Sequence, residues 1–329
     1  MLKGYVNKLL GSFGFQIKRK DALAKERSYL DLKFSGAVNI LKSHQKGCGK
    51  ELDQKLECMV FSKDRAMQLH ALLSSYFDKV TNHCPLVILY KTSNEKSRRS
   101  YNSLKVEFQN YPVLFQNETD FRKQVIGWLQ NSHADRIFFM TDDAIFLDKF
   151  DLNDSLLFNP LNTILSLTKG FDKTFCFALN QEQQIPSFFK RTQHNGNNLN
   201  LWHWDDVPDS PDWSYPLSVD GNIFHREELS AALNHLSFSN PNTLEASMQV
   251  FLDLFSFREG ACYDKVKLVN VPCNIVQKEF HNRSTNYFSI EELQNLWDEG
   301  KRIDISAFNG MSADEACKMK FTFLDESKK

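Results

Sequence analysis

The amino-acid sequence predicts an α/β fold in which a mostly parallel central sheet is flanked by helices. Short apolar runs alternate with segments of helical periodicity over residues 56–140. Alternation of this length implies parallel strands joined by right-handed crossovers. The chain has 329 residues, of which 42% are hydrophobic and 25% charged, so it can form one large domain or two smaller ones with a sizeable core.

The first half of the chain supplies the regular part of this pattern. Strands are expected where apolar residues run almost unbroken, at 56–61, 86–90, 113–115 and 136–140. Helices are expected between them at 66–77, 101–109 and 121–130. The second half is less regular, with strands expected at 174–179, 218–224 and 266–271 and helices at 227–236, 244–255 and 290–297.

A long polar segment, residues 181–216, is predicted to be a loop. A loop of this length inside a compact domain is usually functional. Trp202, Trp204 and Trp213 lie in it among several acids. Exposed Trp rings could cover the apolar faces of a sugar acceptor, whereas buried rings would pin the loop to the core. The residues alone leave both interpretations open.

The two ends of the chain differ from the middle. Residues 1–20 carry apolar side chains at helical spacing and five Lys or Arg, with no acid before Asp21. They predict a basic amphipathic helix, which is either a candidate membrane-surface anchor or an ordinary helix packed on its own domain. Residues 21–54 are expected to form a helix and a linker, and residues 282–329 a C-terminal helical tail.

Composition narrows the class of protein. The seven Cys are scattered without a C-x-x-C spacing, which argues against a disulfide framework or a zinc site and indicates a reducing compartment. No apolar stretch approaches the roughly 20 residues that span a bilayer. A net charge of −1 gives no field directed at nucleic acid. We therefore expect a cytoplasmic protein, in contact with the inner face of the plasma membrane if residues 1–20 bind lipid.

The strongest candidate site is the pair Asp142-Asp143, which follows the predicted strand 136–140 and precedes further apolar residues. Two ionised carboxylates at the end of a buried strand repel each other and resist desolvation. A hard divalent cation such as Mg²⁺ or Mn²⁺ would relieve both problems. The competing interpretation is a turn or helix cap, which Asp also favours.

The order of parts resembles that of the GT-A glycosyltransferases, which use nucleotide sugars. A first strand ends in Phe61-Ser62-Lys63-Asp64-Arg65, and the Asp pair follows later between two apolar runs, as the acidic DxD motif does in that family. The resemblance implies that Asp143, as the last acid, binds Mn²⁺ or Mg²⁺ and that Asp142 faces the sugar or ribose. Thr141 stands where the first acid of a triple would be.

A second segment is similar to the acceptor side of the exostosin-like members. The run 219–229 contains a small-residue turn at Asp220-Gly221 and an aromatic strand ending in His225-Arg226 before a helix. The family places an acidic pair further on at the start of a helix, and here Glu245 matches it alone. The resemblance makes Glu245 and Asp220 the candidate catalytic residues, and the missing second acid leaves inversion or retention open.

Four further residues complete the expected site. Ser62 and Arg65 lie in the first strand-to-helix turn, where nucleotide groups often dock, although helix capping and a solvated Arg would also account for them. Lys278 could grip the diphosphate. His281 matches the late His that GT-A enzymes often add as a metal ligand, although a lone His is more often structural.

Taken together, the resemblance implies a GT-A domain over residues 55–281, with a nucleotide-sugar half at 55–150 and an acceptor half at 151–281. Its expected function is metal-dependent transfer of a sugar from a nucleotide-diphospho-sugar, expected to be UDP-linked, to a glycan or glycolipid. Bacterial surface polysaccharide or lipopolysaccharide synthesis is the natural setting. The alternatives are a catalytically degenerate GT-A fold that binds glycans or partners, and a Mg²⁺-dependent phosphohydrolase.

Overall fold

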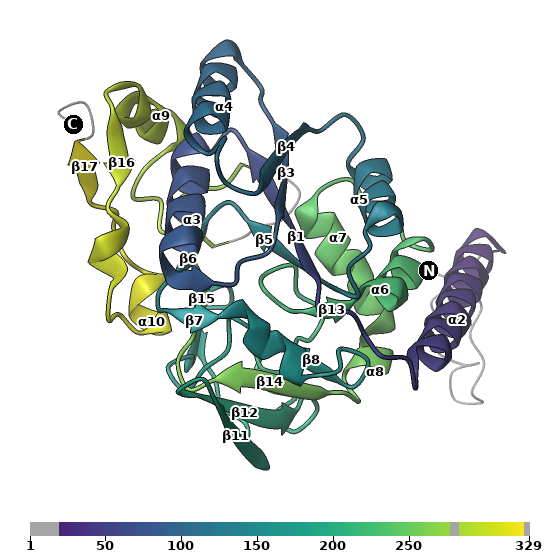
Figure 1. The fold of residues 1–329 in the computed structure, drawn as a ribbon. Helices are drawn as coiled ribbons and strands as arrows, with labels where there is room; N and C mark the ends of the chain where they lie inside the picture. The colour runs from purple at the N-terminus through teal and green to yellow at the C-terminus, as the bar shows by residue number, and fades with distance from the viewer. Residues whose placement is uncertain (1–19, 277–282, 326–329) are drawn as a thin grey trace, which may run out of the picture.

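The computed structural model describes residues 20–276 and 283–325 (Figure 1). Its central sheet has five strands in the order β13-β5-β1-β3-β4, and β1, β3, β4 and β5 are parallel. The bounds are β1 Leu56–Lys63, β3 Leu86–Lys91, β4 Val113–Asn117, β5 Arg136–Thr141 and β13 Phe224–His225. Only β13 runs antiparallel to its neighbour. The predicted α/β class with a mostly parallel sheet is confirmed.

The side chains of β1 alternate between two hydrophobic layers. Cys58 and Val60 pack in a cluster with residues of α3 (Ala66–Lys79) and α4 (Glu95–Glu107). Met59 and Phe61 pack on the opposite face with α5 (Phe121–Asn131), α6 (Arg226–Leu233) and α7 (Pro241–Met248). Burial on both faces explains why β1 and β5 read as continuous apolar runs rather than as alternating ones.

Most predicted elements of the first half are confirmed to within two residues, and α4 is the exception. It begins at Glu95 rather than near residue 101, because the side chain of Asn94 accepts a hydrogen bond from the backbone N–H of Ser97 and caps the helix. The first turn of α4 after Asn94 is polar. It therefore has no apolar periodicity from which the start of the helix could be predicted.

The second half holds a smaller sheet in the order β11-β12-β14-β8. Its strands are β8 Thr163–Leu165, β11 Lys190–His194, β12 Asn197–His203 and β14 Glu259–Tyr263. The expectation that residues 181–216 form one loop is therefore wrong, since β11 and β12 pair as an antiparallel hairpin. Asn195 and Gly196 at its turn both have positive φ, of 47° and 78°, which these residue types adopt most readily.

Three other predicted strands also differ from expectation. Residues 174–179 contribute only the two-residue β9 (Phe175–Cys176), and 218–224 contribute β13 and a single bridge from Asn222 to Ser166. Residues 266–271 form β15 (Leu268–Asn270), which pairs with β6 (Ala144–Phe146) outside the central sheet. This pairing lies directly after the Asp pair and brings Asn270 beside it.

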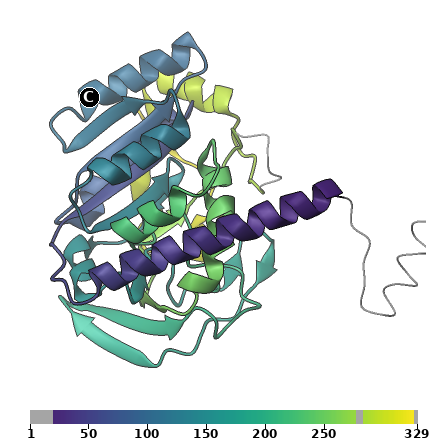
Figure 2. The ribbon, with the colours of Figure 1, turned by 90° about the vertical axis from the view of Figure 1, so that its right-hand side faces the viewer.

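The remaining elements frame the domain. The N-terminal helix α2 (Lys20–Gly47) packs on α6 (Figure 2), and the C-terminal segment packs on α3 (Figure 1). That segment contains α9 Ile290–Asp298, β16 Lys301–Ile303, η3 Ile305–Phe308, α10 Ala313–Ala316 and β17 Phe323–Asp325. The short elements are β2 Val80–Thr81, β7 Phe150–Asp151, η1 Leu152–Leu157, β10 Gln181–Glu182, η2 Gln249–Phe251 and α8 Leu252–Phe255. In the described ranges, no helix has the length and apolar character needed to cross a membrane. The helix predicted over residues 1–20 falls almost entirely outside them.

Candidate active site

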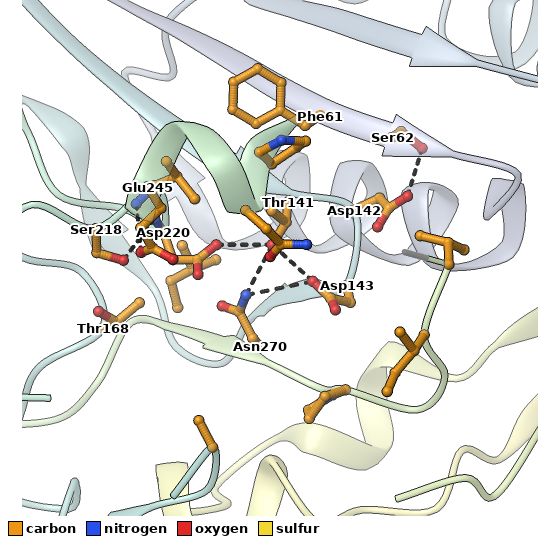
Figure 3. Close-up of a pocket in the computed structure, with 18 of the residues that line it drawn as sticks. Phe61, Ser62, Thr141, Asp142, Asp143, Thr168, Ser218, Asp220, Glu245 and Asn270 are labelled. Carbon is orange, nitrogen blue, oxygen red and sulfur yellow. Dashed lines mark hydrogen bonds between the residues drawn. The ribbon is translucent and has the colours of Figure 1, made fainter. Parts of the chain in front are cut away.

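A cavity of about 770 Å³ opens at the carboxyl ends of β1, β3 and β5. This edge of a parallel sheet is where ligands bind in α/β proteins. The cavity is lined by Ser62, Arg65 and the Asp pair on one side and by Asp220 and Glu245 on the other. Figure 3 shows the Asp pair facing Asp220 and Glu245 across the strand end, with Thr141 and Asn270 between them.

The turn after β1 is fixed by Asp64. This residue has a positive φ of 55°, which Asp tolerates better than most side chains, and its carboxylate accepts hydrogen bonds from the backbone N–H and the hydroxyl of Ser93. The fixed turn places Ser62 and Arg65 against the end of β5, and the nucleotide-binding role expected of them stays a prediction.

Asp142 is held firmly on the β1 side of the cavity. Its Oδ2 accepts hydrogen bonds from the hydroxyl of Ser62 at 2.8 Å and from the backbone N–H of Lys63 at 3.1 Å. The hydroxyl of Tyr101 on α4 hydrogen-bonds Ser62 in turn. The Asp142 side chain is only 2% exposed. Burial raises its pKa to about 6, against the opposing effect of Arg65 and with a further rise from Asp143.

The guanidinium of Arg65 bridges the two carboxylates of the Asp pair. Its Nε lies 3.2 Å from Oδ1 of Asp142, and its Nη1 donates a hydrogen bond to Oδ2 of Asp143 at 3.1 Å. The repulsion that pointed to a metal ion is thus relieved by an arginine. Asp143 is the more accessible of the pair, with 15% of its side chain exposed.

Thr141 connects the two sides of the cavity. Its Oγ1 lies 2.8 Å from Oδ1 of Asp143 and 2.8 Å from Oδ1 of Asp220, and the amide of Asn270 donates to it at 2.9 Å. A hydroxyl carries one proton, so it can donate to only one of these carboxylates at a time. Burial and the neighbouring charge of Asp143 raise the pKa of Asp220, while its hydrogen bonds with Asn270 and Thr141 oppose the rise.

Glu245 lies beside Asp220 in the first turns of α7. The helix begins at Pro241, with Asn240 and Thr243 forming a capping box. Oε1 of Glu245 accepts a hydrogen bond from the backbone N–H of Val219 at 3.2 Å. Burial, together with the charge of Asp220, raises the pKa of Glu245 to about 7, although hydrogen bonds from Ser218 and Val219 oppose this. A carboxyl group with such a pKa can exchange a proton near neutral pH.

The cavity offers few protein ligands to a divalent cation. Among residues 20–276 and 283–325, no three His, Cys, Asp or Glu side chains are grouped to hold a metal. Both oxygens of each carboxylate have partners, since Asp143 contacts Thr141 and Arg65, but Asp143 is the more exposed to the cavity, at 15% against 2% for Asp142. Mg²⁺ often uses one or two protein carboxylates together with substrate phosphates, and Asp143 fits that arrangement. His281 and Lys278 lie outside the described residues, so their predicted roles stay predictions.

Sequence reasoning missed several groups of this cavity. Asn270 lines it from β15, and the buried Tyr101 of α4 hydrogen-bonds the lining residue Ser62. Both positions depend on packing that no local sequence motif predicts. On a third wall, Lys173 lies 3.3 Å from Asp212, and Lys169 is buried with its ammonium donating to the hydroxyl of Thr168. Burial lowers the pKa of Lys169.

The three Trp residues of segment 181–216 are fully buried. The ring centroid of Trp202 lies 4.7 Å from that of Trp204 and 5.1 Å from that of Trp213. The interpretation of exposed sugar-gripping rings is therefore wrong, and the pinning interpretation is confirmed.

Comparison with known proteins places the chain beside glycosyltransferases. No protein-family model matches it. The bifunctional glycosyltransferase pgtA of Dictyostelium discoideum is 27% identical over 195 residues, which are 54% of this chain and 25% of that protein. This similarity confirms the resemblance to glycosyltransferases. The chain thus spans about a quarter of the length of this relative.

Solved structures give a partial backbone likeness. Residues 1–349 of S. aureus TarS share 14% identity with the chain, at a TM-score of 0.43, over 67% of the chain and 61% of that TarS fragment. The mannosyltransferase PcManGT from Pyrobaculum calidifontis, solved with GDP-Man and Mn²⁺, shares 11% identity at a TM-score of 0.30, over 45% of the chain and 48% of that protein.

Proposed function

We propose that this protein is a glycosyltransferase of the GT-A type, which moves a sugar from a nucleotide-diphospho-sugar, in our proposal a UDP-sugar, to a hydroxyl of a glycan or glycolipid. The observation that carries the proposal is that the Asp142–Asp143 strand end faces Asp220 and Glu245 within one cavity. The similarity to a bifunctional glycosyltransferase supports the same reaction class.

The donor half of the site, within residues 55–150, is proposed to bind the nucleotide diphosphate. Arg65 is positioned to pair with phosphate oxygens once a ligand competes for its contact with Asp143, since a guanidinium matches phosphate geometry. Asp143 is the residue proposed to hold Mn²⁺ or Mg²⁺. When bound, such an ion supplies Lewis-acid stabilisation of the departing diphosphate.

The acceptor half, within residues 151–281, is proposed to activate the acceptor hydroxyl. Glu245, with a pKa of about 7, could take the proton of that hydroxyl if the reaction inverts. If the reaction retains configuration, the same carboxylate would position the acceptor or stabilise an oxocarbenium-like centre. Asp220 is proposed to hold an acceptor hydroxyl beside it.

Donor binding measured by calorimetry tests the proposal, using a panel of sugar nucleotides with and without Mn²⁺. We expect one nucleotide sugar to bind more tightly with Mn²⁺ and Asp143→Asn to remove the metal effect. Asp253→Asn is the matched control, because Asp253 lies on α8 in a salt bridge with Lys33, outside the cavity.

The outcomes separate the candidate functions. No binding of any sugar nucleotide would reject the proposal. Binding without donor hydrolysis or transfer would favour a glycan- or partner-binding module instead. Metal-dependent cleavage of simple phosphate esters, with no donor binding, would favour a phosphohydrolase. Synthesis of surface polysaccharide or lipopolysaccharide at the inner face of the plasma membrane remains the proposed setting.

A further inference from the structure

Helix α2 extends beyond the domain on which it packs. Figure 2 shows its N-terminal part projecting past α6 and α7. Every described side chain from residue 23 to residue 31 is exposed. The C-terminal half is anchored: Gly36 lies against the ring of Phe251, and His44 contacts Glu228 at 2.9 Å. A helix held at one end thus presents its other end to the surroundings.

The outward face of α2 carries a stripe of large apolar side chains, here called the α2 stripe. It consists of Leu23 (50% exposed), Leu30 (56%), Phe34 (73%) and Leu41 (55%). These residues are separated by seven, four and seven positions, which at about 3.6 residues per turn places them within about 40° of one another. Four exposed apolar side chains in line on a helix are typical of an interaction surface rather than of a solvated face.

The distribution of charge indicates what the α2 stripe meets. Residues 1–47 contain ten Lys or Arg and three Asp or Glu, a formal charge of +7. The whole chain has a charge of −1, so residues 48–329 carry −8. Two α2 helices brought together would therefore repel each other, whereas an anionic surface would attract this segment and repel the rest of the protein.

We propose that the α2 stripe docks on an anionic lipid surface. An interfacial helix of this kind inserts its apolar side chains at the boundary between headgroups and acyl chains, while its cations contact the headgroups. The α2 stripe lies outside residues 1–20, which supply five of the ten cations of this segment, and the proposal does not depend on the proposed glycosyl transfer. It extends membrane contact to a segment that the sequence identified only as a helix and linker.

Co-sedimentation of the full chain with vesicles tests this inference. We expect binding to vesicles of equal parts phosphatidylglycerol and phosphatidylcholine, little binding to phosphatidylcholine alone, and weaker binding as salt rises. The double variant Leu30→Glu/Phe34→Glu should bind the anionic vesicles about tenfold more weakly or worse. Val106→Glu is the matched control, since Val106 is 65% exposed on α4, and it should bind like the wild type.

Three results would overturn the inference. The double variant could bind anionic vesicles as tightly as the wild type, which would remove the α2 stripe from the contact. Equal binding to neutral vesicles would reject the electrostatic part. Light scattering could show a dimer that the double variant abolishes, which would assign the stripe to a second copy of the chain. Thermal unfolding and circular dichroism of the variant establish that it is folded, and donor binding is measured separately.

Discussion

The guanidinium of Arg65 lies 3.1 Å from the carboxylate of Asp143, at the strand end where the sequence pointed to a metal ion. The same side chain lies 3.2 Å from Asp142. The sequence thus correctly indicated repulsion between the two carboxylates, and in the described structure the guanidinium of Arg65 relieves that repulsion. A cation that arrives with the donor would have to compete with Arg65 for Asp143.

Removing Arg65 should therefore destabilise the fold. In Arg65→Met the buried Asp142 keeps its hydrogen bonds but loses its counter-charge, and breaking a buried pair from one side costs about 3 kcal/mol. Urea unfolding at neutral pH measures the loss, which should shrink as pH falls toward 6, because Asp142 without Arg65 takes up a proton more readily. Arg98→Met is the control, because Arg98 is exposed and should change stability by no more than about 0.5 kcal/mol. Equal effects of the two variants would contradict the prediction.

Glu245 should make stability depend on pH. Its pKa is raised from an ordinary 4.5 to about 7, chiefly by burial, so the folded state holds a proton that the unfolded state has released between these values. Its contribution to stability is then present below pH 4.5 and falls as pH rises to 7. Glu245→Gln should remove up to about 3 kcal/mol of that fall.

Unfolding free energies measured across this pH range check the Glu245 prediction. Glu227→Gln serves as the control, since Glu227 is half-buried on α6 outside the cavity and its replacement should preserve the wild-type slope. If Glu245→Gln also preserved the slope, the raised pKa would be wrong. The role of Glu245 in activating an acceptor would then lose its physical basis.

The packing of Trp202 gives a prediction about stability alone. A Cβ added at Gly260 would lie 2.3 Å from the Trp202 ring, so Gly260→Ala must displace the ring or the strand and should cost about 1–3 kcal/mol. Gly127→Ala is the matched control, since nothing lies within 4 Å of its added Cβ and it lies inside α5. This variant should gain up to about 1 kcal/mol. Thermal unfolding that ranked the two variants in the opposite order would refute this account.

How far the sequence predicts the fold depends on how each element is buried. β1 and β5 are buried on both faces, so their apolar runs identify them directly. The hairpin of β11 and β12 was not predicted from the sequence, because β11 (Lys190–His194) contains no large aliphatic residue. The Asn195-Gly196 turn was a usable signal, since this dipeptide favours the tight turn that joins two antiparallel strands.

The site was predicted in part for a related reason. Asp142, Asp143 and Arg65 follow strands, and strand ends can be placed from local sequence. Asn270 reaches the site only because β15 pairs with β6, a contact between segments more than a hundred residues apart. Long-range pairing of this kind leaves no mark in local periodicity, so neither Asn270 nor the link from Thr141 to Asp220 could be read from the chain.

Thr141 occupies the position where the family resemblance expects an acid, and its hydroxyl takes over a linking role. It lies 2.8 Å from both Asp143 and Asp220, so a side chain without a hydroxyl would remove the hydrogen-bond donor that links the two carboxylates and leave the amide of Asn270 to serve both. Thr141→Val keeps the shape of the side chain and removes its hydrogen-bond donor. Under the proposed function it should lower the rate of sugar transfer at least about tenfold, which is about 1.4 kcal/mol of transition-state stabilisation. Thr141→Ser retains the hydroxyl, and its transfer rate should stay within about threefold of the wild type, because the loss of a methyl group leaves the hydrogen-bond donor in place.

The rates of sugar transfer and the dissociation constants of the sugar nucleotide, measured for both folded variants, check the prediction for Thr141. Equal rates for Val and Ser would show that the hydroxyl takes no part and that Thr141 is only a spacer between the two halves of the site.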